Sequence, residues 1–241
     1  MSSRAVAGLR RAFSTLTVLP LRSTRVDRPA AAVAMASAPL VGAVLGLVLA
    51  GVRLLDVPPL VAGAVTAAAA AVLTRGLHLD GLADTVDALG SYRRGEAALE
   101  VMKKSDIGPF GVAAIGLTLL IQAAALSELH GWVIVAGYAA GRLAVPIACR
   151  RGVPAARPDG LGALVAFTVP RWVVGAAAVL VAAGAVAASG WRGPVAVAVA
   201  LLLAYLLVGH AVRRFGGITG DVIGAAVEIA TTAALVVLTL R

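Results

Sequence analysis

The chain has 241 residues, of which 60% are hydrophobic and 14% are charged, and its net charge is +9. This composition, with a mean hydropathy of +0.95, excludes an ordinary soluble domain and indicates a polytopic membrane protein. Aromatic residues make up only 4% and no basic domain is present, so nucleic-acid binding is not indicated, and the single cysteine, Cys149, excludes an internal disulfide.

The first 30 residues form a basic arm. Its short apolar segment is interrupted by Pro20 and followed by further arginines, which favours a retained cytoplasmic arm over a cleaved signal peptide. Leu9, Phe13 and Leu16 share one helical face, so the arm either forms a helix in the lipid headgroup region or is disordered. Its arginines are Arg4, Arg10, Arg11, Arg22, Arg25 and Arg28.

Seven apolar stretches follow the arm, and each is close to the length that crosses about 30 Å of hydrocarbon. They predict an all-α membrane bundle of about seven transmembrane helices, which forms a single domain over residues 1–241. The stretches are 33–52, 58–75, 110–127, 131–149, 172–190, 194–212 and 219–240.

The connections between these stretches alternate in basic charge. Of the 21 Lys and Arg residues, 17 fall on one side, three fall on the other, and Arg142 lies within a stretch. By the positive-inside rule, the amino terminus, 76–109, 150–171 and 213–218 face the cytoplasm. We therefore expect a multi-pass protein of the cell membrane (the inner or plasma membrane), whose cytoplasmic side is attracted to anionic membrane lipid.

Three carboxylates lie within the segment His78-Leu-Asp-Gly-Leu-Ala-Asp-Thr-Val-Asp-Ala-Leu-Gly90. Asp84 and Asp87 follow Asp80 by four and seven residues, so all three share one face of a helix. Their mutual repulsion favours a bound cation, and oxygen ligands favour Mg²⁺. The alternative is a solvated acidic helix end that binds nothing. Because 76–109 holds six of the twelve acidic residues, we interpret it as a cytoplasmic, acidic active-site loop.

A second acidic motif opens the last apolar stretch. Asp221 and Glu228 lie seven residues apart and share one helical face, with Glu228 about two turns inside the bilayer, where an unpaired carboxylate is costly. Glu228 therefore needs a cation, a proton or a basic partner. Arg142 either is that partner in a structural ion pair or binds a phosphate group.

Glycines cluster beside both acidic motifs, and they either let backbone approach a phosphate group or let two helices pack closely. Two carboxylate helices around a metal ion fit phosphoryl or nucleotidyl-ester transfer, in which metal ions neutralise phosphate charge. We expect the two motifs, about 130 positions apart, to meet in space at a metal-loaded cavity facing the cytoplasm. A cation-coupled transporter is the non-enzyme alternative, although the sequence shows no internal repeat.

The first acidic motif resembles the signature of the cobalamin synthase family, the adenosylcobinamide-GDP ribazoletransferases. The resemblance implies a Mg²⁺-dependent membrane transferase of cobalamin (vitamin B12) biosynthesis, which joins adenosylcobinamide-GDP to α-ribazole or its 5′-phosphate and releases GMP. A more distant likeness to CDP-alcohol phosphotransferases gives a second enzyme alternative. Further segments similar to the cobalamin synthase family, in the same order, are Ala12-Phe-Ser-Thr-Leu-Thr-Val-Leu-Pro20, Pro39-Leu-Val-Gly42, Ile107-Gly-Pro-Phe-Gly111, Gly141-Arg142, Gly160-Leu-Gly162 and Gly217-Ile-Thr-Gly-Asp221-Val-Ile-Gly-Ala225 through Glu228.

With this resemblance we assign site roles to both acidic motifs and their surroundings. The expected metal ligands are Asp80, Asp84, Asp87, Asp221 and Glu228, and the four aspartates among them are also the expected catalytic residues. The expected substrate contacts are His78, Arg142, Gly81, Gly217 and Gly220, with a structural hydrogen-bonding role as the alternative for His78.

One segment departs from the family pattern. The family reads Met-x-Asp-Ser-Arg where this chain has Met102-Lys103-Lys104-Ser105-Asp106, so the acidic and basic positions are exchanged. Lys104 and Asp106 either pair with swapped partners or contact substrate differently. The number of metal ions, the phosphorylation of the acceptor and the formation of a homo-oligomer stay open.

Overall fold

The computed structural model describes residues 3–21 and 27–241 and shows thirteen helices and no strand within these ranges. Two isolated backbone bridges join Arg150 to Val169 and Ala155 to Ile218. The all-α fold class predicted from the sequence is confirmed. The helices are α1 (Ser3–Leu16), α2 (Arg28–Ala36), α3 (Ala38–Val52), α4 (Pro59–Leu73), α5 (Leu77–Gly90), α6 (Gly95–Val101), α7 (Pro109–Glu128), α8 (Trp132–Arg142), α9 (Ala144–Ala148), α10 (Gly160–Val165), α11 (Arg171–Ser189), α12 (Arg192–Phe215) and α13 (Gly220–Leu238).

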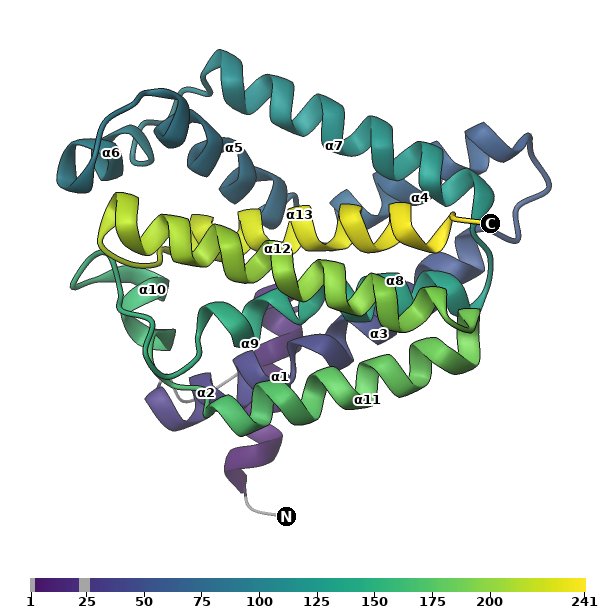
Figure 1. Ribbon diagram of the computed structural model, residues 1–241, viewed down its shortest axis with the longest axis horizontal. Coiled ribbons are helices and arrows are strands. Elements are labelled where there is room, and N and C mark those ends of the chain that lie inside the picture. The colour runs from purple at the N-terminus through teal and green to yellow at the C-terminus, as the bar shows by residue number, and fades with distance from the viewer. Residues whose placement is uncertain (1–2, 22–26) are drawn as a thin grey trace.

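Helices α8 and α13 form the centre of the bundle (Figure 1). Eight of the 11 residues of α8 and twelve of the 19 residues of α13 are buried. Helix α3 packs on α8, while α5, α7 and α12 pack on α13. Helix α11 lies at the edge, where only Ala185 and Ser189 are buried. The side chains of α13 are therefore surrounded by protein rather than by lipid.

Glycines let these helices pack backbone against backbone. A Cβ placed on Gly46 of α3 would lie 2.7 Å from Cα of Val135 in α8, and a Cβ on Gly63 of α4 would lie 2.7 Å from the amide nitrogen of Ser127 in α7. Both distances are shorter than van der Waals contact, so only glycine fits at these crossings. Packing of this kind, through close approach of small residues, is typical of helices in lipid.

In the part of the chain that the structure describes, four helices are long and apolar enough to cross a membrane, namely α7, α11, α12 and α13. Two bent pairs, α2 with α3 and α4 with α5, raise the number to six if each pair is one broken span. The segment Trp132–Ala148 is apolar but shorter. The structure thus supports a multi-pass bundle with four to six candidate spans, where the sequence predicted about seven.

Local backbone geometry bends or divides the chain at two of these places. Helix α4 ends at Leu73, and the chain turns through Arg75 and Gly76, both with positive φ, before α5 begins at an angle of 89°. The apolar stretch 131–149 is likewise divided, since α8 ends at Arg142 and α9 adds only five residues. Length and hydropathy alone do not reveal such breaks.

Most of the segment 76–109, which the sequence analysis interpreted as a loop, is helical. Helix α5 covers 14 of its residues and α6 another seven. Leu79, Leu82 and Ala83 are buried and recur at helical spacing, so α5 packs on α13 and α7 in spite of its three aspartates. The acidic segment is therefore part of the rigid bundle.

The connections of the bundle separate into two ends (Figure 1). Residues 91–108, 149–170 and 216–219 gather at one end, and 53–58, 129–131 and 190–191 gather at the other, beside the carboxyl terminus. This arrangement agrees with the alternation of basic charge along the sequence.

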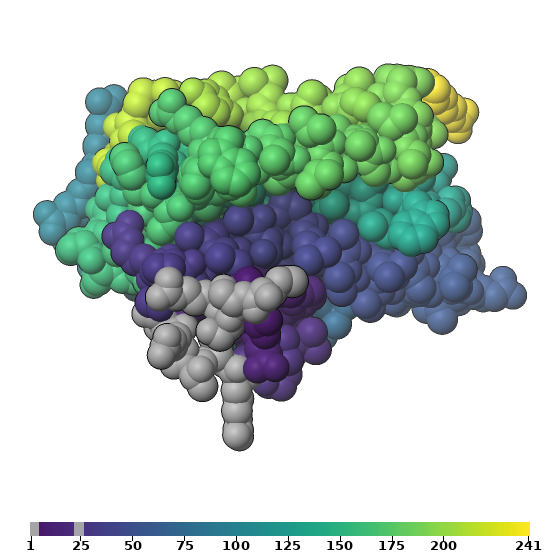
Figure 2. All heavy atoms as spheres, turned by 90° about the horizontal axis from the view of Figure 1, so that it is seen from below, coloured from purple at the N-terminus to yellow at the C-terminus, as the bar shows by residue number. Residues whose placement is uncertain are grey.

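The first part of the basic arm is a helix that packs on the bundle. Ala12 and Leu16 of α1 are buried and α1 packs on α2, while Val6 and Leu9 are exposed. Figure 2 shows α1 projecting from the face that carries α2. Of the two alternatives for the arm, a helix is therefore the one found for residues 3–16. Arg22 and Arg25 lie outside the described residues.

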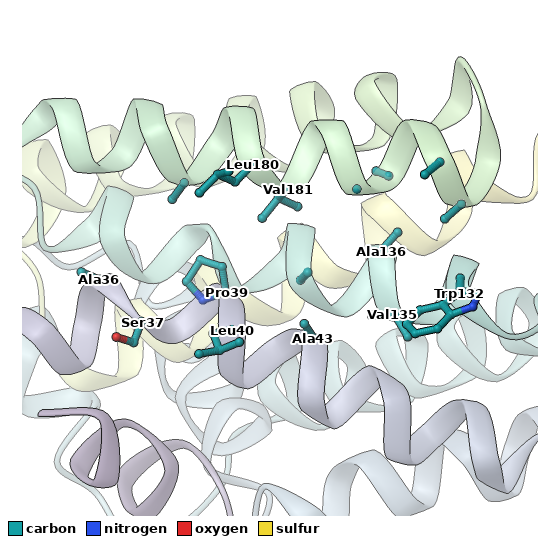
Figure 3. A pocket seen from close by; sticks show the side chains of 16 residues that line it. Ala36, Ser37, Pro39, Leu40, Ala43, Trp132, Val135, Ala136, Leu180 and Val181 are labelled. Carbon is teal, nitrogen blue, oxygen red and sulfur yellow. The ribbon is translucent and has the colours of Figure 1, made fainter. Parts of the chain in front are cut away.

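An apolar groove of about 640 Å³ lies between α11 and α3, with α8 at its base (Figure 3). Leu40, Val135, Leu180 and Val181 line it together with many alanines, and Ser37 is the only hydroxyl side chain there. An apolar lining on the outside of a membrane bundle is suited to contact with lipid chains.

Candidate active site

Helices α5 and α13 cross in direct contact and bring the two acidic motifs together. A Cβ on Gly81 would lie 2.7 Å from the carbonyl oxygen of Asp221, and a Cβ on Gly224 would lie 3.2 Å from Cα of His78. The two glycines remove the side chains that would hold the helices apart. The two motifs thus meet in space through their helix backbones, whereas their joint binding of a metal ion stays a prediction.

Four carboxylates and one guanidinium interact electrostatically at this crossing. The charge of Asp84 interacts with those of Asp221, Asp80 and Asp87 and with that of Arg157, and the charge of Asp221 interacts with those of Arg157 and Asp80. Asp80 is exposed, whereas Asp84 and Asp221 are half-buried. Because one arginine offsets only part of the repulsion among the carboxylates, the cluster attracts a further cation.

Thr219 fixes the direction of the Asp221 side chain. Its Oγ1 accepts a hydrogen bond from the N–H of Val222 at 3.2 Å, which caps α13, and donates its own proton to Oδ2 of Asp221 at 3.1 Å. Asp221 is thereby held in the first turn of α13, where the helix dipole favours a negative charge.

Asp221 and Arg157 line a cavity of about 210 Å³. Its walls are the first turn of α13 and the segment that leads into α10, and they comprise Arg157, Asp159, Gly160, Leu161, Gly162, Ile218, Thr219, Gly220 and Asp221. A second cavity of about 450 Å³ also contains Arg157 and Asp159 in its lining and extends to Glu96 and Glu100 of α6. These two glutamates are exposed and face this second cavity.

Arg157 is the site residue that the sequence analysis missed. A terminal nitrogen of its guanidinium donates to the carbonyl oxygen of Leu99, and its Nε is buried without a partner in the described structure. A guanidinium group that lines a cavity is suited to binding a phosphate oxygen. Its position in the sequence could have indicated it, because Arg157 lies three residues before Gly160-Leu-Gly162, a segment similar to the family pattern.

Asp87 has structural partners that the sequence analysis did not foresee. Its Oδ2 accepts from the N–H of Gly108 at 2.7 Å and its Oδ1 accepts from the N–H of Gly111 at 2.9 Å. Asp87 thus satisfies backbone donors at the start of α7 from a neighbouring helix. A Cβ on either glycine would collide with the carboxylate, which explains both glycines of the Gly108-Pro-Phe-Gly111 segment. Metal binding by Asp87 stays a prediction.

Glu228 and Arg142 lie in a separate and deeper cluster of buried polar side chains. Oε2 of Glu228 accepts from Nε2 of Gln122 at 2.8 Å, and the same amide donates to Thr232 at 2.9 Å. Arg142 and Glu228 are both buried, and with Gln122 and Tyr138 they line a cavity of about 10 Å³, the space of one water molecule.

This placement favours the alternative in which Arg142 is the buried basic partner of Glu228. Arg142 lies against Gly42 of α3, inside the bundle, and it lines neither of the cavities that contain Arg157. The expected contact between Arg142 and substrate therefore has no geometric support. Glu228 likewise has Gln122 as its hydrogen-bond partner, two turns away from Asp221.

Of His78 and the three glycines expected to contact substrate, only one lines the cavity beside Asp221. His78 is buried, and neither ring nitrogen has a partner in the described structure, so it does not reach the cavity beside Asp221. Gly81 packs on α13, and a Cβ on Gly217 would lie 2.5 Å from the amide nitrogen of Ala156. Gly220 differs, because it lines the cavity and has room for a Cβ.

The donors at the crossing suit Mg²⁺, which prefers hard carboxylate oxygens. Within the described residues no group of three Asp, Glu, His or Cys side chains is arranged so that it could hold a metal ion. Metal binding by Asp80, Asp84 and Asp221 therefore stays a prediction. Lys104 and Asp106, where the chain departs from the family pattern, are both exposed between α6 and α7.

Comparison with known proteins gives consistent matches over nearly the whole chain. The model of a family described as cobalamin-5-phosphate synthase matches residues 8–239. A protein of Nocardioides sp. named adenosylcobinamide-GDP ribazoletransferase is 44% identical over 231 residues, which cover 93% of this chain and 94% of the relative. Proteins with the same name from Frankia casuarinae and Pseudomonas paraeruginosa are 42% and 38% identical, over 95% and 98% of this chain and 93% and 99% of their own lengths. No solved structure matches the chain.

Proposed function

The chain belongs to the cobalamin-5-phosphate synthase family, and from this membership we propose that it joins adenosylcobinamide-GDP to α-ribazole or its 5′-phosphate. The products are adenosylcobalamin or its 5′-phosphate, together with GMP. The observation that carries the proposal is the crossing of α5 and α13, which gathers carboxylates of both acidic motifs beside Arg157 and a cavity. The relatives' names favour this transferase over a CDP-alcohol phosphotransferase and over a cation-coupled transporter.

The reaction is a phosphoryl-ester transfer. A ribose hydroxyl oxygen of the acceptor forms a bond to the phosphorus attached to cobinamide, and the bond from that phosphorus to the bridging oxygen breaks. GMP leaves with the electron pair of that bond, and the hydroxyl proton passes to a base. Positioning of the attacking oxygen and neutralisation of phosphate charge supply most of the catalysis in reactions of this class.

We assign Mg²⁺ binding to Asp80, Asp84 and Asp221, with Asp87 mainly positioning α7. When bound, the ion supplies positive charge that neutralises the pyrophosphate. Arg157, which lines both cavities, donates to a phosphate oxygen and stabilises the charge of the departing GMP. An aspartate of the cluster that is not bound to the ion accepts the hydroxyl proton, a contribution of about 10²–10⁴ in rate.

We place this site at the cytoplasmic face of the cell's inner or plasma membrane. The support is the distribution of basic residues, of which 17 out of 21 fall on one side of the predicted topology. The connections that carry them gather at the end of the bundle where α6 and α10 lie (Figure 1). Both cavities that contain Arg157 are lined by residues of this end.

The test is turnover by the purified full-length protein in detergent. Adenosylcobinamide-GDP and Mg²⁺ are supplied with either α-ribazole or its 5′-phosphate, and GMP and the cobalamin product are measured together. We expect stoichiometric formation of both products with at least one acceptor, and no product from Asp84→Asn. Failure with both acceptors, or CMP release from a CDP-alcohol donor in place of GMP release, would contradict the proposal.

A further inference from the structure

A basic pocket of about 740 Å³ lies outside the active site, between the turn after α9 and helices α11 and α12. Arg150, Arg151 and Arg171 line it, and the other walls are formed by glycine, apolar residues and one tyrosine. Among the described residues, no Asp or Glu is part of the lining, and the pocket shares no residue with the two cavities at Arg157. Three cations above an apolar floor are complementary to an anion that carries an apolar tail.

The arginines of this pocket are held in place by the fold. Nε of Arg171 donates to the carbonyl oxygen of Arg151 at 3.3 Å. Gly152, with a φ of +102°, leaves room for the Arg171 guanidinium, whose Nη2 would lie 3.0 Å from a Cβ at that position. Arg150 stacks on Tyr205, with Cζ 4.7 Å from the ring centroid. Burial, and to a smaller extent Arg171, lowers the pKa of Arg150, so an anion bound between the guanidinium groups relieves their repulsion.

The pocket lies at the depth of a lipid headgroup. Arg171 is the first residue of a candidate span, and Trp172 beside it is 75% exposed, as is typical of aromatic side chains at the membrane interface. Leu202 and Tyr205, which are 55% and 57% exposed, continue the wall along the outside of α12. We propose that this pocket binds the headgroup phosphate of one anionic phospholipid, with the acyl chains lying along the apolar surface of α12.

Lipid binding to the full-length protein in a mild non-ionic detergent tests the proposal. The protein is titrated with phosphatidylglycerol or phosphatidylcholine, and bound lipid is counted by native mass spectrometry. We expect one phosphatidylglycerol to bind about tenfold more tightly than phosphatidylcholine, and inorganic phosphate not to displace it. Arg151→Gln should weaken phosphatidylglycerol about fivefold, because the Arg151 side chain makes no hydrogen bond to protein in the described structure and contributes charge alone.

Arg151→Gln/Arg171→Gln should weaken phosphatidylglycerol about 25-fold. Arg213→Gln is the matched control. Arg213 is exposed near the carboxyl end of α12, has the same charge as Arg151 and does not line the pocket. If the double variant does not fold, the comparison of Arg151→Gln with Arg213→Gln decides. Equal weakening by these two single variants, equal binding of both lipids, or displacement by inorganic phosphate would overturn the proposal.

Discussion

Replacing Gly81 by alanine places a methyl carbon 2.7 Å from the carbonyl oxygen and 2.9 Å from Cα of Asp221. A relaxed contact needs about 3.5 Å, so α5 and α13 have to separate by roughly 0.8 Å at this point. Overpacking of this kind lowers the free energy of unfolding by about 1–3 kcal/mol. Because Asp80 and Asp84 lie on α5 and Asp221 lies on α13, the same displacement separates the proposed metal ligands, and a misplacement of about 1 Å lowers turnover about 10²-fold.

Thermal unfolding and GMP release measure these two effects separately. Gly116→Ala on α7 is the matched control, because a Cβ there meets nothing within 4 Å, and it should unfold and turn over like the wild type. We expect Gly81→Ala to remain folded at the assay temperature with turnover lowered about 10²-fold. Wild-type turnover by Gly81→Ala would refute the argument that this crossing sets the geometry of the site.

Removal of charges, of metal and of a helix cap tests the remaining assignments. Asp84→Asn and Asp221→Asn should each lower GMP release at least about 10²-fold, because a neutral amide is a weak Mg²⁺ ligand. Neither variant should lower the unfolding temperature of the metal-free protein, because one repelling charge is lost. Asp56→Asn, in the connection at the opposite end of the bundle, should leave GMP release and the unfolding temperature unchanged. Chelation should abolish GMP release and Mg²⁺ should restore it, so release that persists without divalent metal would exclude the metal assignment. Arg157→Gln should lower kcat about 10²-fold and Arg157→Lys should recover only part of it, whereas unchanged kinetics in both would remove Arg157 from the site. Asp87→Asn should lower the free energy of unfolding by about 1–2 kcal/mol through the loss of one bond to α7, and an unchanged unfolding midpoint would contradict the capping role.

The membrane makes much of this fold predictable from composition. Every one of the seven apolar stretches contains a helix, and the alternation of basic charge matches the two ends of the bundle. The apolar stretches and the alternating basic charge both depend on whether a segment lies in lipid or in water, not on which residues it contacts. The bend after Leu73 depends instead on the positive φ of Arg75 and Gly76, which no hydropathy average contains. Hydropathy therefore predicts the apolar helices but not the bends between them, and the structure gives four to six candidate spans where about seven were predicted.

The acidic residues could be found from helical spacing, but their separation into two clusters could not. A spacing of seven puts Asp221 and Glu228 on one face, yet two turns of helix separate them, and Glu228 lies beside its partner Gln122 of α7. The backbone donors that hold Asp87 lie 21 and 24 positions away and have no side chain to signal them. Arg157 lies in a connection, where no periodicity predicts the direction of a side chain.

Glu228, two turns inside α13, helps to position the carboxylates of the candidate site although it lies outside that site. Asp221 and Glu228 share one face, so the rotation of α13 about its axis sets the direction of both side chains. Gln122 of α7 binds Glu228 and so fixes that rotation, while the start of α7 is bound by Asp87 of α5. Helix α5 in turn contacts α13 at Gly81, so contacts between the three helices form a closed circuit around the carboxylates. Each helix is thus positioned by the other two, so the backbone segments that carry the carboxylates keep their relative places although the charges repel one another.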